Sequence, residues 1–212
     1  MKGLTTILLS AAVLTACARK EAAPQAAAPA ARVKQEAAAP PQLSPDQIMS
    51  RIKAAGTPGE EHAKLQPLIG KWKTESKFWI DPGKAPEVSR GSARNEWILG
   101  KRFLKQDYTG KFIGQNFQGG GVLGFDKTKK EYFSTWVDSM GTGVMISEGK
   151  FDSAASKLEM SGKYSCPITG GERASRTVTR IINKNQYVFE MYDFGPDGSE
   201  YKSLEITYKR SS

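Results

Sequence analysis

The chain has 212 residues, of which 31 are Lys or Arg and 22 are Asp or Glu, giving a formal net charge of +9. One histidine and two cysteines exclude a disulfide-rich scaffold and argue against a clustered His/Cys metal site. The basic residues are spread along the sequence, as at Lys71, Lys73 and Lys127. This spread favours an evenly solvated surface over a patch that attracts anionic lipid headgroups.

The first residues follow a charged, apolar and small-residue pattern that is typical of exported proteins. Lys2 precedes an apolar stretch from Leu4 to Leu14, too short for a bilayer span of about 20 residues but suited to a signal peptide over residues 1–16. Leu14-Thr15-Ala16-Cys17 then resembles the lipobox of bacterial lipoproteins, in which the Cys is acylated. The alternative is an ordinary secretory signal that leaves Cys17 as a free thiol.

Acylation of Cys17 predicts a stable anchor, because two or three chains such as palmitate hold a protein where one chain binds only marginally. Ala18 follows the Cys, at a position where Asp often retains Gram-negative lipoproteins in the inner membrane. We therefore expect a cell-envelope protein, at the outer membrane facing the periplasm if the source is Gram-negative. An exported, tethered protein rarely meets nucleic acid, so no nucleic-acid partner is expected.

Two segments precede the main domain. Residues 17–43 are rich in Ala, Pro and Gln and lack aromatic residues, which predicts a disordered tether. Residues 44–61 predict a short helical segment, since Ser44-Pro45-Asp46-Gln47 has the residues of a capping box and Gly56 suits a helix stop. Thr57-Pro58-Gly59-Glu60 repeats the start signal for a second helix to about Leu65, which Pro67 interrupts.

From Gly70 the apolar period changes from 3.6 to 2, as in a β-strand with one buried face. Tight turn signals separate about ten strands, which predicts an all-β fold: an antiparallel up-and-down barrel, or alternatively a sandwich. Glycines between Gly114 and Gly124 are expected to supply bulges. The predicted strands begin near residue 70 and continue at 87–99, 101–109, 116–126, 131–138, 143–151, 157–164, 173–182, 186–193 and 199–209.

Seven motifs follow one another through residues 62–212. They are His62-Ala63-Lys64-Leu65-Gln66-Pro67-Leu68-Ile69-Gly70-Lys71-Trp72, Phe78-Trp79, Asp81-Pro82-Gly83, Trp97-Ile98-Leu99-Gly100-Lys101-Arg102-Phe103-Leu104, Thr135-Trp136-Val137-Asp138-Ser139-Met140-Gly141-Thr142-Gly143, Phe189-Glu190-Met191-Tyr192 and Glu205-Ile206-Thr207-Tyr208. Together they resemble a bacterial family of unknown function, DUF1579. The resemblance implies a lipocalin- or calycin-like barrel but no reaction, ligand or catalytic residue. Gly70-x-Trp72 also resembles the lipocalin first-strand signature, which implies that Lys209 or Arg210 packs over Trp72.

Candidate ligand-binding residues are the polar and aromatic side chains near these motifs: Trp72, Trp97, Arg102, Trp136, Asp138, Met140 and Arg176. Each has a structural alternative. Asp138 is more simply explained as the cap of the turn that follows, with Trp136 in the core. The charged residues Arg90, Arg94 and Glu96 point outward if Trp97 and Leu99 line the core. Arg176 and Arg180 share a strand face with Val178, so whether they point inward is open; an inward pair would hold a carboxylate.

Other kinds of site find little support in the sequence. His62 is the single histidine, so neither a metal cluster nor the late proximal His of a nitrobindin-like haem barrel is expected, and no cofactor is predicted. The glycine run lacks the Lys-Ser/Thr of a phosphate-binding loop, and no Gly-x-Ser-x-Gly elbow occurs.

Three hypotheses about function remain. The favoured one is a membrane-tethered barrel without enzymatic activity that binds a small amphipathic or apolar ligand inside. The second is an envelope module with a packed barrel that contacts another protein or the cell wall, the partner being unknown. The third and least favoured is an enzyme that uses inward carboxylates such as Asp107, Glu96 and Asp138.

Overall fold

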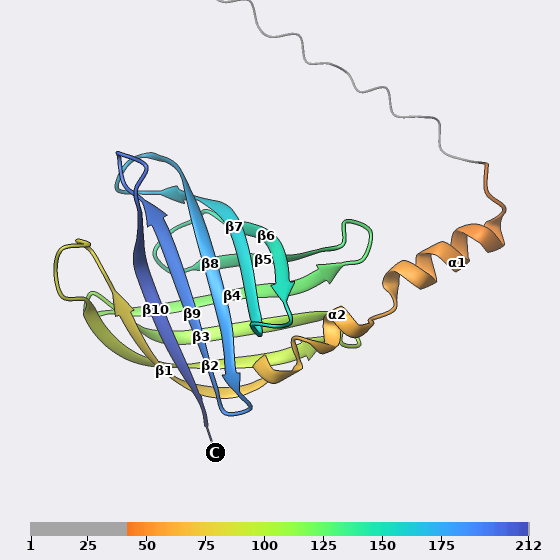
Figure 1. Cartoon of the computed structure of the whole chain (residues 1–212), viewed down its shortest axis with the longest axis horizontal. Coiled ribbons are helices and arrows are strands. Elements are labelled where there is room, and N and C mark those ends of the chain that lie inside the picture. Colours follow the sequence, from red (N-terminus) through yellow and green to blue (C-terminus); the bar gives the residue numbers. More distant parts are fainter. Residues whose placement is uncertain (1–41, 212) are drawn as a thin grey trace, which may run out of the picture. The chain divides into compact units, whose positions relative to one another are not determined.

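The computed structural model describes residues 42–211 and shows two short helices, a 3₁₀ turn and ten strands (Figure 1). The predicted signal peptide, Cys17 and nearly all of the predicted tether lie outside the described residues. Within them, no helix has the length and apolar character needed to cross a membrane. The elements are α1 (Pro45–Gly56), α2 (Glu60–Ala63), η1 (Gln66–Leu68), β1 (Gly70–Phe78), β2 (Glu87–Ile98), β3 (Phe103–Phe112), β4 (Gln115–Asp126), β5 (Glu131–Asp138), β6 (Met145–Asp152), β7 (Lys157–Cys166), β8 (Gly171–Asn183), β9 (Gln186–Phe194) and β10 (Glu200–Arg210).

The ten strands form one closed antiparallel barrel. Each strand pairs with the next along the chain, and β10 pairs with β1 to complete the ring, with Trp72 opposite Arg210. In Figure 1, β8 to β10 cross steeply over β2 to β4. The predicted up-and-down barrel is thus confirmed, and the sandwich is excluded because no sheet edge remains open.

Strand alternation separates an inner from an outer face. On β1, Trp72, Thr74 and Ser76 are buried, and Lys73 and Glu75 between them are exposed. On β2, Ala93 and Asn95 are buried, so the charged residues Arg90, Arg94 and Glu96 face outward as the Trp97 pattern indicates. Leu99 does not line the core: it begins the turn after β2, with a φ of 49° and an exposed fraction of 68%.

The glycine run in β4 does not produce bulges. Its register with β3 and with β5 is continuous, and its glycines make room for aromatic rings instead. A Cβ on Gly119 would lie 2.3 Å from the Trp136 ring, and one on Gly124 would lie 2.8 Å from the Phe103 ring. The register irregularities occur elsewhere, between Lys202 and Leu204 on β10 and at the β8–β9 turn.

The ten strands give the barrel two distinct ends. The closed end carries α2 and η1 and the turns 99–102, 127–130, 153–156 and 184–185; the open end carries the turns 79–86, 113–114, 139–144, 167–170 and 195–199. At the closed end, Leu68 O accepts hydrogen bonds from Trp72 Nε1 at 2.9 Å and Asn95 Nδ2 at 2.8 Å. Leu65 and Leu68 are buried there. The segment before β1 therefore seals this end.

One of the two helices before the barrel is shorter than the sequence predicted. The capping box of α1 is confirmed: Gln47 N donates to Ser44 Oγ at 3.3 Å, and Ser44 N donates to Gln47 Oε1 at 2.9 Å. The second helix, α2, ends at Ala63 rather than near Leu65. Pro67 lies inside the 3₁₀ turn η1, where its missing N–H costs nothing in the first turn.

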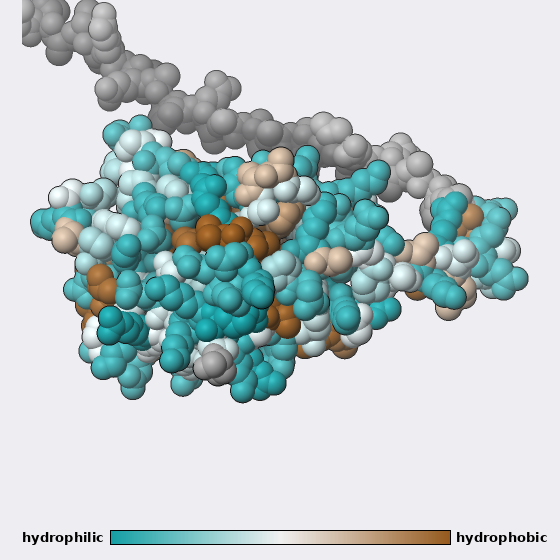
Figure 2. Space-filling model, turned by 60° about the horizontal axis from the view of Figure 1, so that its bottom comes forward, coloured by the Kyte–Doolittle hydropathy of each residue, from teal (hydrophilic) through white to brown (hydrophobic). Residues whose placement is uncertain are grey.

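Figure 2 shows a mainly hydrophilic face with small, separate hydrophobic areas.

Candidate functional site

Two inner-face serines in the open half of the barrel have no hydrogen-bond partner in the protein. Ser147 on β6 and Ser175 on β8 flank Gly162 on β7 in one register row, and each serine is only 2% exposed. Their hydroxyls are the two buried side-chain oxygens without a partner among the described residues. A Cβ on Gly162 would lie 2.2 Å from Ser147 Oγ, so glycine is required between them. A buried hydroxyl left unpaired costs about 1–3 kcal/mol, which a ligand acceptor would recover.

A polar cluster adjoins this serine row toward the open end. Tyr164 on β7 pairs with Arg173 on β8, and Asp193 on β9 pairs with Ser175 and with Tyr201 on β10. Tyr164 donates to Asp193 Oδ1 at 3.2 Å, and Arg173 donates to Phe194 O at 2.6 Å. A hydrogen bond to Tyr201 raises the pKa of Arg173, so the guanidinium stays charged. Arg173 is therefore a cation held beside the unpaired serines.

The other side of the open half is apolar. Phe78 on β1, Phe112 on β3 and Phe117 on β4 form a ring cluster, with centroid distances of 4.6 Å from Phe78 to Phe112 and 6.3 Å from Phe112 to Phe117. Deeper in, Leu123 and Phe189 pack against the core but stay partly exposed. The inner surface of the open half is therefore aromatic on one side and polar on the other, as the binding of an amphipathic molecule requires.

At the closed end, by contrast, buried polar groups satisfy one another. Asn95 Nδ2 donates to Tyr187 Oη at 3.0 Å, and Gln106 Nε2 donates to Asn95 Oδ1 at 2.9 Å. The Tyr187 and Tyr208 rings stack at 4.1 Å, and burial raises the pKa of Tyr187 well above its ordinary value. This network fills the closed end, so the candidate site lies in the open half.

The sequence matches a known protein family. The family described as "Protein of unknown function (DUF1579)" matches residues 57–210. This chain belongs to that family. The matched range nearly coincides with the predicted domain at 62–212, and the family brings no assigned reaction or ligand. No curated protein matches the sequence.

A solved structure shares the fold of this DUF1579 domain. The crystal structure of Rv2717c from M. tuberculosis is 16% identical, with a TM-score of 0.58 over 74% of this chain and 100% of that chain. Two redesigned β-barrels match less closely: b11L5F_LGL, 14% identical over 70% of this chain and 96% of that one, TM-score 0.37; and mFAP1 bound to DFHBI, 16% identical over 69% and 98%, TM-score 0.38. At these identities the likeness concerns the fold alone.

Three of the residues proposed from the sequence lie at the closed end of the DUF1579 barrel, away from its open half. Trp72 is 1% exposed at the closed end, and Arg210 lies 4.2 Å from its ring, which is the packing that the lipocalin resemblance implies. Trp97 donates to Gln66 Oε1 at 2.9 Å, at the same end. Arg102 is exposed in the β2–β3 turn and donates to Leu99 O. All three therefore have structural contacts that do not involve the inner serines.

Arg176 points outward from the barrel. It contacts Glu200 at 2.7 Å and Glu159 at 3.2 Å, and its guanidinium lies 4.2 Å from the Tyr192 ring. Hydrogen bonding to Glu200 raises the pKa of Arg176. The inward arginine on β8 is Arg173, three residues earlier. The sequence offered a signal for it, because Arg173 shares the alternation of Ser175, Thr177 and Thr179, which are all buried.

The remaining three sequence candidates lie together near the β5–β6 loop. Asp138 Oδ2 accepts a hydrogen bond from Trp136 Nε1 at 3.1 Å, and Asp138 Oδ1 accepts one from Met140 N at 2.9 Å. The carboxylate thus caps the turn, as the structural alternative stated, and Met140 is 48% exposed. Trp136 alone packs against the core and lines the inner surface.

The arrangement gives no support to catalysis by the suggested carboxylates. Asp107 and Glu96 face outward, where they pair with Lys105 at 2.9 Å and Arg94 at 2.7 Å. Asp193 on β9 is a buried carboxylate on the inner face of the open half that sequence reasoning missed. His62 accepts a hydrogen bond from Gly59 N at 3.2 Å, and burial lowers its pKa. Within residues 42–211, no group of three His, Cys, Asp or Glu side chains is placed to hold a metal.

Proposed function

We propose that this protein is a lipid-anchored envelope barrel that binds a small amphipathic molecule in the open half of its interior. The observation that carries the proposal is the pair of buried, unpaired hydroxyls of Ser147 and Ser175 beside the charged Arg173. Three donors of this kind suit a ligand head group with acceptor oxygens, such as a carboxylate. The rings of Phe78, Phe112 and Phe117 suit its apolar part.

The anchor is the second part of the proposal. The Leu14-Thr15-Ala16-Cys17 motif supports acylation of Cys17, and Ala18 supports an outer-membrane location facing the periplasm in a Gram-negative host. Intact-mass measurement of the protein extracted from host membranes tests this. We expect a mass consistent with cleavage before Cys17 and two or three acyl chains. A mature protein recovered from these membranes without acyl chains would contradict the anchor.

The binding proposal is tested with a fluorescent amphipathic anion, 1-anilinonaphthalene-8-sulfonate, titrated into the protein. We expect saturable binding that Ser147→Ala/Ser175→Ala weakens about tenfold, because two hydrogen bonds to the head group are lost. Ser161→Ala is the matched control, since Ser161 is an exposed serine on the outer face of β7. The probe failing to bind, together with native mass spectra free of any co-purified molecule, would refute the proposal.

One observation favours a second candidate, the interaction module. Two hollows lie on the outer face of β5 to β7, with volumes of about 490 and 240 Å³. Their lining includes Glu148 and Glu159 with Lys157, so a polar partner surface fits them better than an apolar ligand does. Cross-linking from Lys150 in cells tests this candidate. Recovery of no protein or peptidoglycan partner would contradict it.

A further inference from the structure

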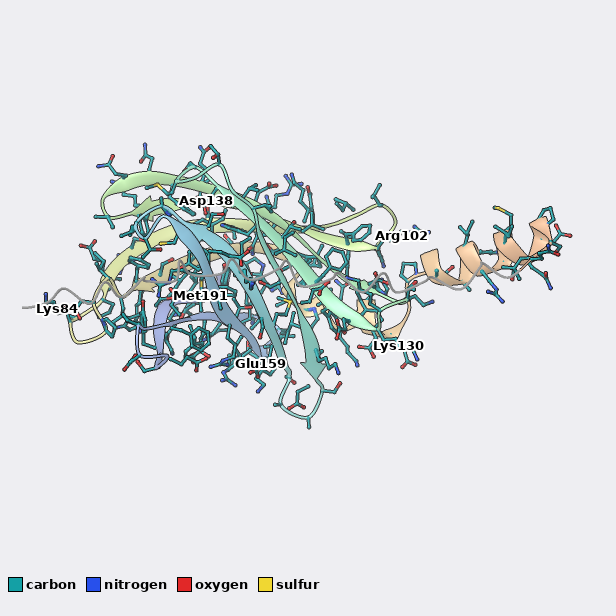
Figure 3. The ribbon with its side chains drawn as sticks, turned by 90° about the horizontal axis from the view of Figure 1, so that it is seen from above. Lys84, Arg102, Lys130, Asp138, Glu159 and Met191 are labelled. Carbon is teal, nitrogen blue, oxygen red and sulfur yellow. The ribbon has the colours of Figure 1, made fainter. Side chains whose placement is uncertain are left out.

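Basic residues gather at one end of the barrel. The four turns at the closed end contain six basic residues and no acidic residue: Lys101, Arg102, Lys127, Lys129, Lys130 and Lys184. The five turns at the open end contain one basic residue, Lys84, and two acidic residues, Asp81 and Asp197. Figure 3 shows Arg102 and Lys130 at the end that carries α2, and Lys84 at the opposite end. Basic residues that are dispersed along the sequence are therefore gathered at the closed end of the folded barrel.

Most of this positive charge is not neutralised by ion pairs. All six side chains belong to exposed residues. Among the ion pairs of the described chain, Lys129 is the only one of the six to take part, with Glu148 at 2.6 Å. Five carboxylates lie at the same end, in α2 and at strand ends: Glu60, Glu61, Asp126, Glu131 and Asp152. Three of them are already engaged: Asp126 accepts Thr128 N at 2.7 Å, Asp152 accepts Ala154 N at 3.0 Å, and Glu61 pairs with Lys64 at 2.8 Å. The closed end consequently presents a positive surface to solvent.

The helix α1 adds an apolar component to this end. It has no buried residue, and Ile48, Met49 and Ile52 are 43%, 62% and 58% exposed. Lys127 of the β4–β5 turn donates to Ala54 O at 2.6 Å and to Thr57 O at 3.1 Å, which fixes the C-terminal end of α1 to the basic turns. A short helix with unburied apolar side chains next to basic residues has the features of an interfacial membrane helix.

We infer that the closed end, together with α1, lies directly on an anionic lipid bilayer. Complementary charge and the exposed apolar side chains of α1 identify the bilayer as the partner. The position of the proposed anchor agrees, because only 27 residues of sequence separate Cys17 from α1, the first helix of the described residues. The inference rests on the proposed acylation of Cys17 and not on the proposed ligand. It orients the open end, with the inner serines, away from the anchoring membrane.

The first test uses the intact acylated protein in lipid nanodiscs. Hydrogen exchange is compared between discs of phosphatidylcholine alone and discs that contain 30% phosphatidylglycerol. We expect the amides of α1 and of residues 127–130 to exchange more slowly in the anionic discs, and 500 mM salt to abolish the difference. Equal exchange in both discs would overturn the inference. Intact mass of the same sample reports acylation separately, so a failed anchor and a failed docking surface give different results.

The second test measures partitioning of the unacylated mature chain, carrying Cys17→Ser, into anionic vesicles. Each basic residue near such a surface contributes about fivefold, so Lys101→Glu/Lys130→Glu is expected to weaken partitioning about 25-fold or more. Lys84→Glu/Lys111→Glu makes the same charge change at the open end and is expected to have less than a twofold effect. Ile52→Gln and Ile168→Gln form the matching apolar pair, since Ile168 is 93% exposed at the open end. Equal losses in the two charge-reversal variants would overturn the inference.

Discussion

Replacement of Arg210 by Ala tests how the barrel is closed. The Arg210 guanidinium lies 4.2 Å from the Trp72 ring and donates to Ile69 O at 2.8 Å, Lys184 O at 2.8 Å and Pro67 O at 3.1 Å. One side chain at the end of β10 therefore ties together the entry to β1 and the β8–β9 turn. Its removal is expected to destabilise the fold while leaving the strands intact.

The magnitude follows from these contacts. We take about 1 kcal/mol for the ring contact. Each of the three hydrogen bonds contributes about 0.5 kcal/mol, at the low end of the usual range because Arg210 is exposed. Arg210→Ala should thus lower the free energy of unfolding by about 2.5 kcal/mol. Arg210→Lys should lose about half of this, because an ammonium group keeps the charge over the ring but cannot reach three carbonyls.

Urea denaturation followed by tryptophan fluorescence measures the effect, with an unchanged m value indicating the same denatured state. Lys209→Ala is the control, because Lys209 is the exposed neighbour on the same strand and should change stability by less than about 0.5 kcal/mol. An Arg210→Ala variant as stable as the control would show that the cation over Trp72 does not hold the barrel closed.

Three further predictions concern stability. Gly121→Ala should cost about 1–3 kcal/mol, because a Cβ there would lie 2.1 Å from Thr135 O, whereas Gly171→Ala, with nothing within 4 Å, should be nearly neutral in the same denaturation assay. Tyr132→Phe should cost about 1–2 kcal/mol through loss of the hydrogen bond to Glu61 Oε2 at 2.7 Å, read as a lower urea midpoint. Burial alone would raise the pKa of Glu190, but hydrogen bonds from Lys202 and Arg180 outweigh it and hold that pKa below its ordinary value. The ionised Glu190 therefore stabilises the folded state above the unfolded pKa of about 4.3, and this stabilisation is lost as pH falls through the lower folded pKa. Glu190→Gln should flatten the acid side of a profile of Tm against pH. An unchanged profile would contradict this.

The sequence predicted the fold well because the signals for it are local. The alternation around Trp72 and Thr74 reveals a strand with one buried face within a few residues, and the capping box at Ser44 involves only four residues. Ring closure is not local, but the Trp72–Arg210 contact was available through the family resemblance. The glycines of β4 were misread because sequence alone does not show which side chain crosses them; Trp136, on the next strand, does.

The site was harder to predict because its members are placed by closure of the ring. Ser147 and Ser175 are ordinary serines until β6, β7 and β8 pair around Gly162. Arg176 was misleading for a different reason. Val178 has an exposed fraction of 0% although it lies on the outer face, since the charged residues of β8 and its neighbouring strands cover it. Because Val178 shares the face of Arg176, the sequence left open which face of β8 is the inner one.

The charge polarity has a topological cause. In an up-and-down barrel, successive turns alternate between the two ends, so residues in every second turn lie at the same end although they are about 26–31 residues apart in sequence. Lys101, Lys130 and Lys184 all lie in such alternate turns, which is why a chain with evenly spread lysines builds one basic end. The same alternation places the aromatic and polar lining at the opposite end. If the basic end faces the anchoring bilayer, a ligand must enter from the aqueous side, so ligand exchange should not require contact between the open end and that membrane.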